Sequence, residues 1–245
     1  MLKKTFYSLI FFLMVCQAIT SLGLLDSKIF PTPLGIFFNI YQNKAPLSYH
    51  AAHTLWRLVV GVLLAIAWAI PLAFFINKYE VMSRMVRPIL ACFYPIPKIA
   101  IYPFILLIFG TGDVPKIILI ALGAFFLLFS TMANSLDRIK NSSLMEVVSV
   151  YQITGLKLYY HVFWKGVYFD FLYGLNLAIG YGLVMSVASE MSAANNGLGF
   201  YIWNSWDAYR ILDMYAGLVV ISALGLAFYF GIELLRIKLL NRSMI

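Results

Sequence analysis

Lys98 and Glu190 are ionisable side chains in long apolar runs of this 245-residue chain, where either could act on a charged solute. Lys98 lies between Pro97 and Pro103, and an amine at such a depth usually faces a cavity or a partner. Together with Pro95, these prolines predict a broken helix. Lys98 could attract anions along a pathway, or its aliphatic stem could snorkel to the cytoplasmic interface. Glu190 ends another apolar run, where it could pair with Arg210, line a gate, or simply mark the membrane interface.

Catalytic and metal chemistry find little support in the sequence. His50 and His53 form an HxxH pair, but no nearby cysteine or acidic residue completes a site, so we expect no metal. An intramembrane enzyme would need a nucleophile–base pair or clustered acids, and the spans hold no HExxH, GxSxG or paired aspartates. The GxxxxGK[ST] motif is absent too. We therefore expect no cofactor on this chain, and an ATP-driven process would need a separate ATPase.

The elements that position these residues must lie in a membrane. The chain is 62% hydrophobic and 11% charged, with a mean hydropathy of +0.87, whereas soluble domains carry about a quarter charged residues. Apolar runs of about 20 residues recur, and this length crosses a bilayer core of roughly 30 Å as a helix. We expect an all-α integral membrane protein with about six spans, at residues 6–25, 54–76, 88–110, 115–136, 170–190 and 214–235.

The net charge is +8, and the lysines and arginines lie mostly at the ends of the apolar runs, as membrane topology requires. They form no basic face for nucleic acid, so we do not expect nucleic acid as a partner. With the N-terminus inside, the inside segments hold Lys3, Lys4, Lys78, Arg84, Arg87, Arg138, Lys140, Lys157, Lys165, Arg236, Lys238 and Arg242. The outside segments hold only Lys28, Lys44, Lys116 and Arg210. We therefore expect both termini in the cytoplasm, and residues 26–52, an irregular loop, and 191–213 outside.

The inside segment at 137–169 is too long for a turn between two helices. It has one apolar stripe at helical spacing, formed by Leu144, Val147, Val148 and Tyr151. Ser143 and Glu146 are spaced as a capping box at its start, and Gly155 can end the helix. These apolar side chains need a surface to be buried against, which could be the protein's own helical bundle, a partner protein or the bilayer.

This segment resembles the cytoplasmic EAA loop of binding-protein-dependent ABC importer permeases. Glu146-Val147-Val148 occupies the Glu-Ala-Ala place, and YGLNLAIG at 173–180 follows in register. Gln152 stands where the family has Gly, and Lys165 where it has Pro. Two further stretches resemble the nitrate, sulfonate and taurine subgroup: YPIPKIAIYPFILLIFGTGDVPKIILIALGAFF at 94–126 and ASEMSAANNGLGFYIW at 188–203.

The resemblance covers roughly residues 50–240 and implies a permease subunit in a bacterial inner membrane, with a MetI-like transmembrane domain. A separate ATPase would dock on the loop, at Leu144, Glu146, Val147, Val148, Tyr151 and Gly155. An extracytoplasmic binding protein would deliver a small solute, and a second permease copy would complete a homodimer. The subgroup suggests sulfonates, taurine, nitrate or bicarbonate. We expect residues 1–52 to form a helix and outer loop, and 53–245 the permease domain.

Two other functions remain as alternatives. One is the intramembrane enzyme, against which the missing motifs argue. The other is a secondary carrier that works without an ATPase. Such carriers often show inverted repeats and several ionisable residues near the membrane midplane, and the sequence has no clear repeat.

Overall fold

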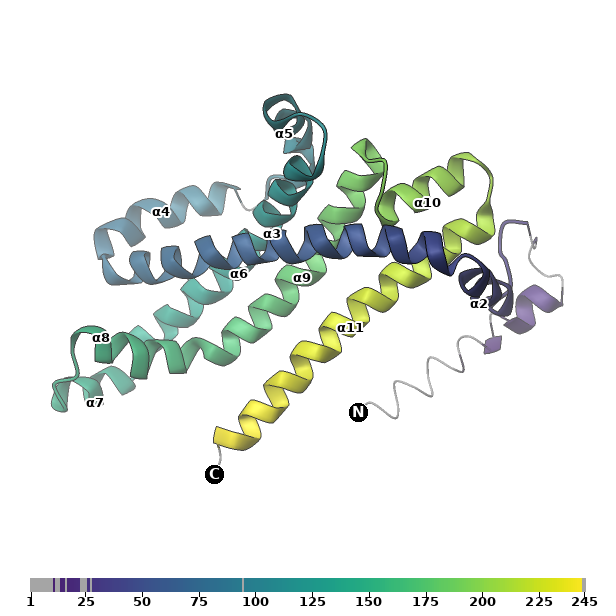
Figure 1. The fold of residues 1–245 in the computed structure, drawn as a ribbon. Coiled ribbons are helices and arrows are strands. Elements are labelled where there is room, and N and C mark those ends of the chain that lie inside the picture. Colours follow the sequence, from purple (N-terminus) through teal and green to yellow (C-terminus); the bar gives the residue numbers. More distant parts are fainter. Residues whose placement is uncertain are drawn as a thin grey trace. The chain divides into compact units, whose positions relative to one another are not determined.

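The computed structural model describes residues 11, 14–15, 17–22, 26, 28–93 and 95–243. Every regular element in this part of the chain is helical, as Figure 1 shows, and this confirms the predicted all-α class. The chain divides into two units. Unit 1 comprises residues 1–54 and 190–224, and unit 2 comprises residues 55–189 and 225–245.

The helices have the following bounds, in chain order: α2 (Pro33–Gln42), α3 (Lys44–Lys78), α4 (Glu80–Phe93), η1 (Lys98–Ile101), α5 (Tyr102–Phe109), α6 (Asp113–Lys140), α7 (Leu144–Val150), α8 (Gly155–Lys157), η2 (Leu158–Trp164), α9 (Lys165–Ala193), α10 (Leu198–Asp207) and α11 (Ile211–Ser243). The short η1 is a 3₁₀ turn and η2 is a π-helical stretch.

Four stretches are long and apolar enough to cross a membrane, at Lys44–Lys78, Asp113–Lys140, Gly155–Ala193 and Ile211–Leu239. They contain the predicted spans at 54–76, 115–136, 170–190 and 214–235. The predicted span at 88–110 is instead two helices, α4 and η1–α5, which meet at a bend of more than 40°. The prolines at 95, 97 and 103 predicted such a break. The predicted span at 6–25 falls largely outside the described residues.

The segment at 26–52 is more helical than its prolines suggested, so the prediction of an irregular loop is wrong. Thr32 is the N-cap of α2, and its side chain accepts a hydrogen bond from the Gly35 amide, with Pro33 in the first turn. Pro46 lies in the first turn of α3. Proline is compatible with these positions because amide groups in the first turn have no partner within the helix.

Unit 2 is built around α6, which buries residues along most of its length. Leu119, Ile120, Leu128, Met132 and Leu136 are all fully buried. Small residues let α3 and α9 come close to α6. A Cβ added at Gly61 of α3 would lie 2.6 Å from Ile120, and one at Gly174 of α9 would lie 3.0 Å from Thr131. Both glycines therefore serve contacts within this bundle.

Unit 1 has a small apolar core that holds the short helix α10. Leu47, Leu198, Tyr201 and Ala216 form this core, bringing together the start of α3, α10 and the first turns of α11. Burial raises the pKa of Tyr201 to about 12, so its hydroxyl stays neutral. The core fixes α10 just after the end of α9.

Candidate functional site

The predicted stripe on the segment at 137–169 divides into two parts. Leu144, Val147 and Tyr151 are 46%, 51% and 74% exposed, whereas Val148 is only 6% exposed and packs into its own unit. Further apolar side chains on the same segment are exposed as well: Val150, Leu156 and Tyr160. Val148 thus anchors α7, while the other three stripe residues present apolar surface.

The helix start at Ser143 was predicted correctly, but the capping box was not. Ser143 is the N-cap of α7, yet its side chain makes no capping hydrogen bond. Its backbone lies in the right-handed helical region, at φ −58° and ψ −16°, whereas a capping side chain needs an extended residue. Instead the backbone carbonyl of Ser143 accepts from the Glu146 amide, at 3.1 Å. Glu146 therefore sits in the first turn of α7 without a Ser143 side-chain cap, and its part in the docking loop stays a prediction.

The end of α7 explains why the family has Gly where this chain has Gln152. The Ile153 amide donates to the Val148 carbonyl and the Gln152 amide to the Ser149 carbonyl, both at 3.1 Å. This pair of bonds defines a Schellman motif, whose second-to-last residue adopts a left-handed conformation and is usually Gly. Gln152 adopts it here, with φ +50°. The turn therefore keeps its geometry at a conformational cost to a residue with a side chain.

Gly155 lies three residues further on and is also left-handed, with φ +62°. We expected it to set the bend in place of the missing Gly. The chain in fact turns at Gln152 and again at Gly155, the first residue of α8. After α8, the π-helical stretch leads directly into α9. Lys165, at the family's Pro position, donates its backbone amide to the Val162 carbonyl, a bond that proline cannot make.

Lys98 is 6% exposed and lies at the break between α4 and η1. Its Nζ donates to the carbonyl of Phe93, the last residue of α4, at 3.0 Å, and lies 4.9 Å from the centre of the Phe126 ring on α6. A cation at a helix C-terminus satisfies carbonyls that have no partner within the helix. This position favours a role in holding the bend, and a pathway role for Lys98 stays a prediction.

Glu190 is fully buried at the end of α9, in unit 1. Both carboxylate oxygens accept from the Thr54 hydroxyl, at 2.9 and 3.0 Å, and Oε2 also accepts from the Gly199 amide at 2.9 Å. The Thr54 oxygen in turn accepts from the Leu198 amide, at 2.8 Å. Because Leu198 and Gly199 are the first residues of α10, Glu190 and Thr54 together cap this helix.

The turn before α10 is fastened to α3 as well. The Gly197 amide donates to Nδ1 of His50, at 3.1 Å. Gly197 has φ +105°, and a Cβ there would lie 2.3 Å from the Glu190 carboxyl carbon. We call His50, Thr54, Glu190 and Gly197 the clasp of α10. The clasp gives His50 a structural role. We considered Arg210 as a partner of Glu190, and it forms an ion pair with Asp213 at 3.4 Å.

Sequence reasoning missed an ion pair in unit 2 between a buried arginine and a half-exposed aspartate. The Arg57 side chain is 2% exposed and donates to Oδ1 of Asp113 through Nε at 2.8 Å and Nη2 at 2.7 Å. Arg57 stands within an apolar run, and this signal alone marks a residue that needs a carboxylate partner. The partner lies 56 positions away at the start of α6, so the sequence did not identify it.

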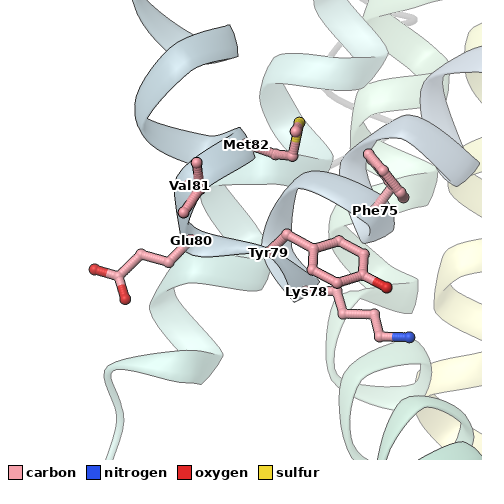
Figure 2. Close-up of a pocket in the computed structure, with 6 residues that line it drawn as sticks. All are labelled: Phe75, Lys78, Tyr79, Glu80, Val81 and Met82. Carbon is pink, nitrogen blue, oxygen red and sulfur yellow. The ribbon is translucent and has the colours of Figure 1, made fainter.

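A hollow of about 460 Å³ opens over the turn between α3 and α4. Figure 2 shows the residues that line it: Phe75, Lys78, Tyr79, Glu80, Val81 and Met82. The Glu80 carboxylate points away from Lys78. Lys78 Nζ lies 5.2 Å from the centre of the Tyr79 ring. Aromatic rings beside a lysine are typical of a membrane interface. Among the described residues, no group of three or more His, Cys, Asp or Glu side chains could hold a metal ion.

Four long apolar helices and one bent helix pair among the described residues are the architecture of a multi-pass membrane protein. Residues 50–241 match the family model of the binding-protein-dependent transport system inner membrane component. The chain belongs to this family, and it is a permease subunit of the ABC transporter type. The match confirms the resemblance identified from the loop and the two subgroup stretches.

Three relatives illustrate the range of the family. A probable ABC transporter permease protein of Haemophilus influenzae is 26% identical, with 90% of each chain covered. The putative aliphatic sulfonates transport permease protein SsuC of Bacillus subtilis is 24% identical, over 93% of this chain and 83% of the relative. The formylaminopyrimidine transport permease protein ThiX of Halalkalibacterium halodurans is 26% identical, over 95% of both chains.

The left-handed Gln152 gives a first prediction. Gln152→Gly should stabilise the protein by roughly 0.5–1 kcal/mol, because glycine removes the conformational strain but also gains freedom in the unfolded chain. The midpoint of thermal unfolding in detergent should rise by a few degrees. Gly155→Ala is the matched control, since it places a Cβ on a left-handed residue and should lower the midpoint. An unchanged or lower midpoint for Gln152→Gly would contradict the prediction.

The clasp gives a second prediction. Thr54→Val keeps the side-chain shape but leaves the Leu198 amide without its Thr54 acceptor and removes the Thr54 hydroxyl as a donor to the Glu190 carboxylate. We expect a loss of about 2–4 kcal/mol, since buried groups that lose their partners are costly. Thr131→Val is the control, because Thr131 bonds only to the Leu127 carbonyl of its own helix, at 2.8 Å. Equal shifts in the unfolding midpoint of the two variants would count against the clasp.

Proposed function

We propose that this chain forms the translocation pathway of an ATP-driven importer and catalyses no reaction itself. A separate ATPase subunit supplies the energy, and this chain holds no cofactor. The observation that carries the proposal is the exposed apolar surface of Leu144, Val147 and Tyr151 on the segment between α6 and α9. Exposed apolar groups gathered on one short helix favour a protein partner.

The geometry of α7 supports docking as a rigid element. Val148 is buried, so one face of this short helix is fixed to its own unit while the other is free to fill a groove. The Schellman motif at Gln152 fixes the end of the helix. Burying a half-exposed valine or leucine contributes on the order of 1 kcal/mol, at about 25 cal/mol per Å². Several such side chains together offset part of the cost of association.

The remaining partners follow from the family. A binding-protein-dependent permease works with an extracytoplasmic solute-binding protein, and we propose a second copy of this chain as the other half of the pathway. For the solute, relatives of similar identity carry names that refer to aliphatic sulfonates and to formylaminopyrimidine. We therefore propose a small solute selected mainly by the binding protein, with sulfonate-type anions as the first class to test.

The two alternative functions have less support. The ionisable groups buried in the described helices have structural partners, such as the Phe93 carbonyl for Lys98 and Asp113 for Arg57. A secondary carrier would need groups that bind and release a coupling ion, and an intramembrane enzyme would need a reactive pair. Transport that continues after the ATPase subunit is removed would favour the carrier.

We propose that the segment at 137–169 and both termini face the cytoplasm, from the distribution of lysine and arginine. Asn141 and Asn195 are both exposed and lie on opposite sides in this topology. In a variant without native cysteines, Asn195→Cys should react with an impermeant thiol reagent on intact cells, and Asn141→Cys only after the cells are opened. The reverse labelling would contradict the topology.

Docking through α7 gives the next prediction. Val147→Asp should insert normally but lose most of the ATPase from the affinity-purified complex, measured as ATP hydrolysis per permease. An aspartate would place an unpaired charge in a desolvated contact, at a cost of about 2 kcal/mol or more, or over tenfold in affinity.

Two controls separate docking from folding. Ser149→Asp adds the same charge two residues away, at an exposed position off the stripe, and should retain the ATPase. Val148→Asp should reduce insertion or stability, because Val148 is buried in its own unit. If Val147→Asp retains as much ATPase as Ser149→Asp, α7 is not the docking element.

A further inference from the structure

The last two turns of α6 carry four polar side chains that reach three other helices of unit 2. Asp137 pairs with Arg87 of α4. Arg138 pairs with Asp170 of α9 at 2.7 Å, and the Ser135 hydroxyl donates to the same carboxylate. Lys140 donates to the Asn77 carbonyl near the end of α3, at 3.4 Å. We call Ser135, Asp137, Arg138 and Lys140 the α6 hub.

The hub is joined to α7 by a hydrogen-bonded connection of three residues. The Asn141 amide donates to the Asp137 carbonyl at 3.0 Å, and the Ser142 amide to Ile139 at 3.1 Å. The Met145 amide then donates to the Ser142 carbonyl at 3.1 Å. Because each step of the connection is bonded, a displacement of α7 moves the end of α6 with it.

The Arg138–Asp170 pair closes the loop between α6 and α9. Residues 155–193 form one continuous helical stretch, so Asp170 belongs to the element that the loop enters. The pair therefore braces the two ends of the loop against each other. Figure 1 shows α7 and α8 at the same end of this unit.

The Arg87–Asp137 pair extends the connection to the broken span. Arg87 lies in the middle of α4, and its Nε also donates to Ser83 at 2.7 Å, which orients the guanidinium. Lys98 contacts the last carbonyl of α4 and the Phe126 ring of α6. The helix α4 is thus held to α6 at two levels, and its far end is the bend that leads into η1 and α5.

We propose that the α6 hub transmits the movement of α7 to the broken span, with Arg87 and Asp137 as positioning residues. This inference rests on the proposed function. A rigid element that docks on an ATPase can shift as one body, and the hub is the point where that shift reaches α3, α4 and α9 together. Within a membrane, backbone that leaves regular helical geometry is tolerated where it is buried in protein or lines a water-filled cavity. The broken span is therefore a candidate lining of the transport pathway.

A pair of arginines on α4 allows a matched test. Arg87→Ala cuts the contact with α6, whereas Arg84→Ala removes the same group from an exposed pair with Glu80 within α4. In the purified permease–ATPase complex in lipid vesicles, Arg87→Ala should reduce solute uptake per ATP hydrolysed by about tenfold. It should keep the ATPase bound and the unfolding midpoint close to that of the wild type, and Arg84→Ala should change none of these.

A charge exchange separates coupling from stability. The double variant Arg87→Asp with Asp137→Arg should recover at least half of the wild-type uptake per ATP. The inference is overturned if Arg87→Ala couples as well as Arg84→Ala, or if the exchanged pair assembles normally but stays uncoupled. If the wild-type permease purifies with no ATPase, the proposed function itself fails, which is a different result from an ATPase that is bound but uncoupled.

Discussion

Lipid offers no hydrogen bonds, so polar groups in the apolar runs of this chain need partners within the protein. The structure meets this constraint mainly at helix ends. The amine of Lys98 donates to the last carbonyl of α4, and the carboxylate of Glu190 accepts from the Gly199 amide in the first turn of α10. Asp113 begins α6 and pairs with the guanidinium of Arg57. The ionisable residues that first suggested a pathway are therefore also the ones that end and begin the helices.

Backbone strain is found at two turns that follow short helices. Two non-glycine residues among those described have positive φ, Gln152 at +50° and Tyr209 at +54°. Each follows a short helix and lies in a Schellman motif. At Tyr209, its own amide donates to the Trp206 carbonyl, and the Arg210 amide donates to the Ser205 carbonyl. Left-handed residues with side chains persist only where the surroundings fix them. Both turns are thus held by their helix ends rather than by local preference.

Local patterns predicted what depends on local physics. Hydropathy located the long helices, prolines located the broken span, and the quoted motifs gave the family. The missed features depend on distant partners or on competing local states. Thr54 and Glu190 meet across 136 positions, and Arg57 and Asp113 across 56. Periodicity placed Val148 on the stripe, but only the packed structure shows that it faces inward.

The two departures from the family motif, Gln152 and Lys165, lie at positions whose backbone dihedrals suit the Gly and Pro that the family has there. At Gln152 the bonds from Ile153 to Val148 and from Gln152 to Ser149 impose the left-handed turn that glycine would adopt freely. At Lys165 the backbone has φ −64°, which proline would also adopt, and its amide adds a bond to Val162. Since backbone geometry positions α7, a loop that differs in these two side chains can still present the same helix to a partner, with a cost in stability at the first position and a gain in hydrogen bonding at the second.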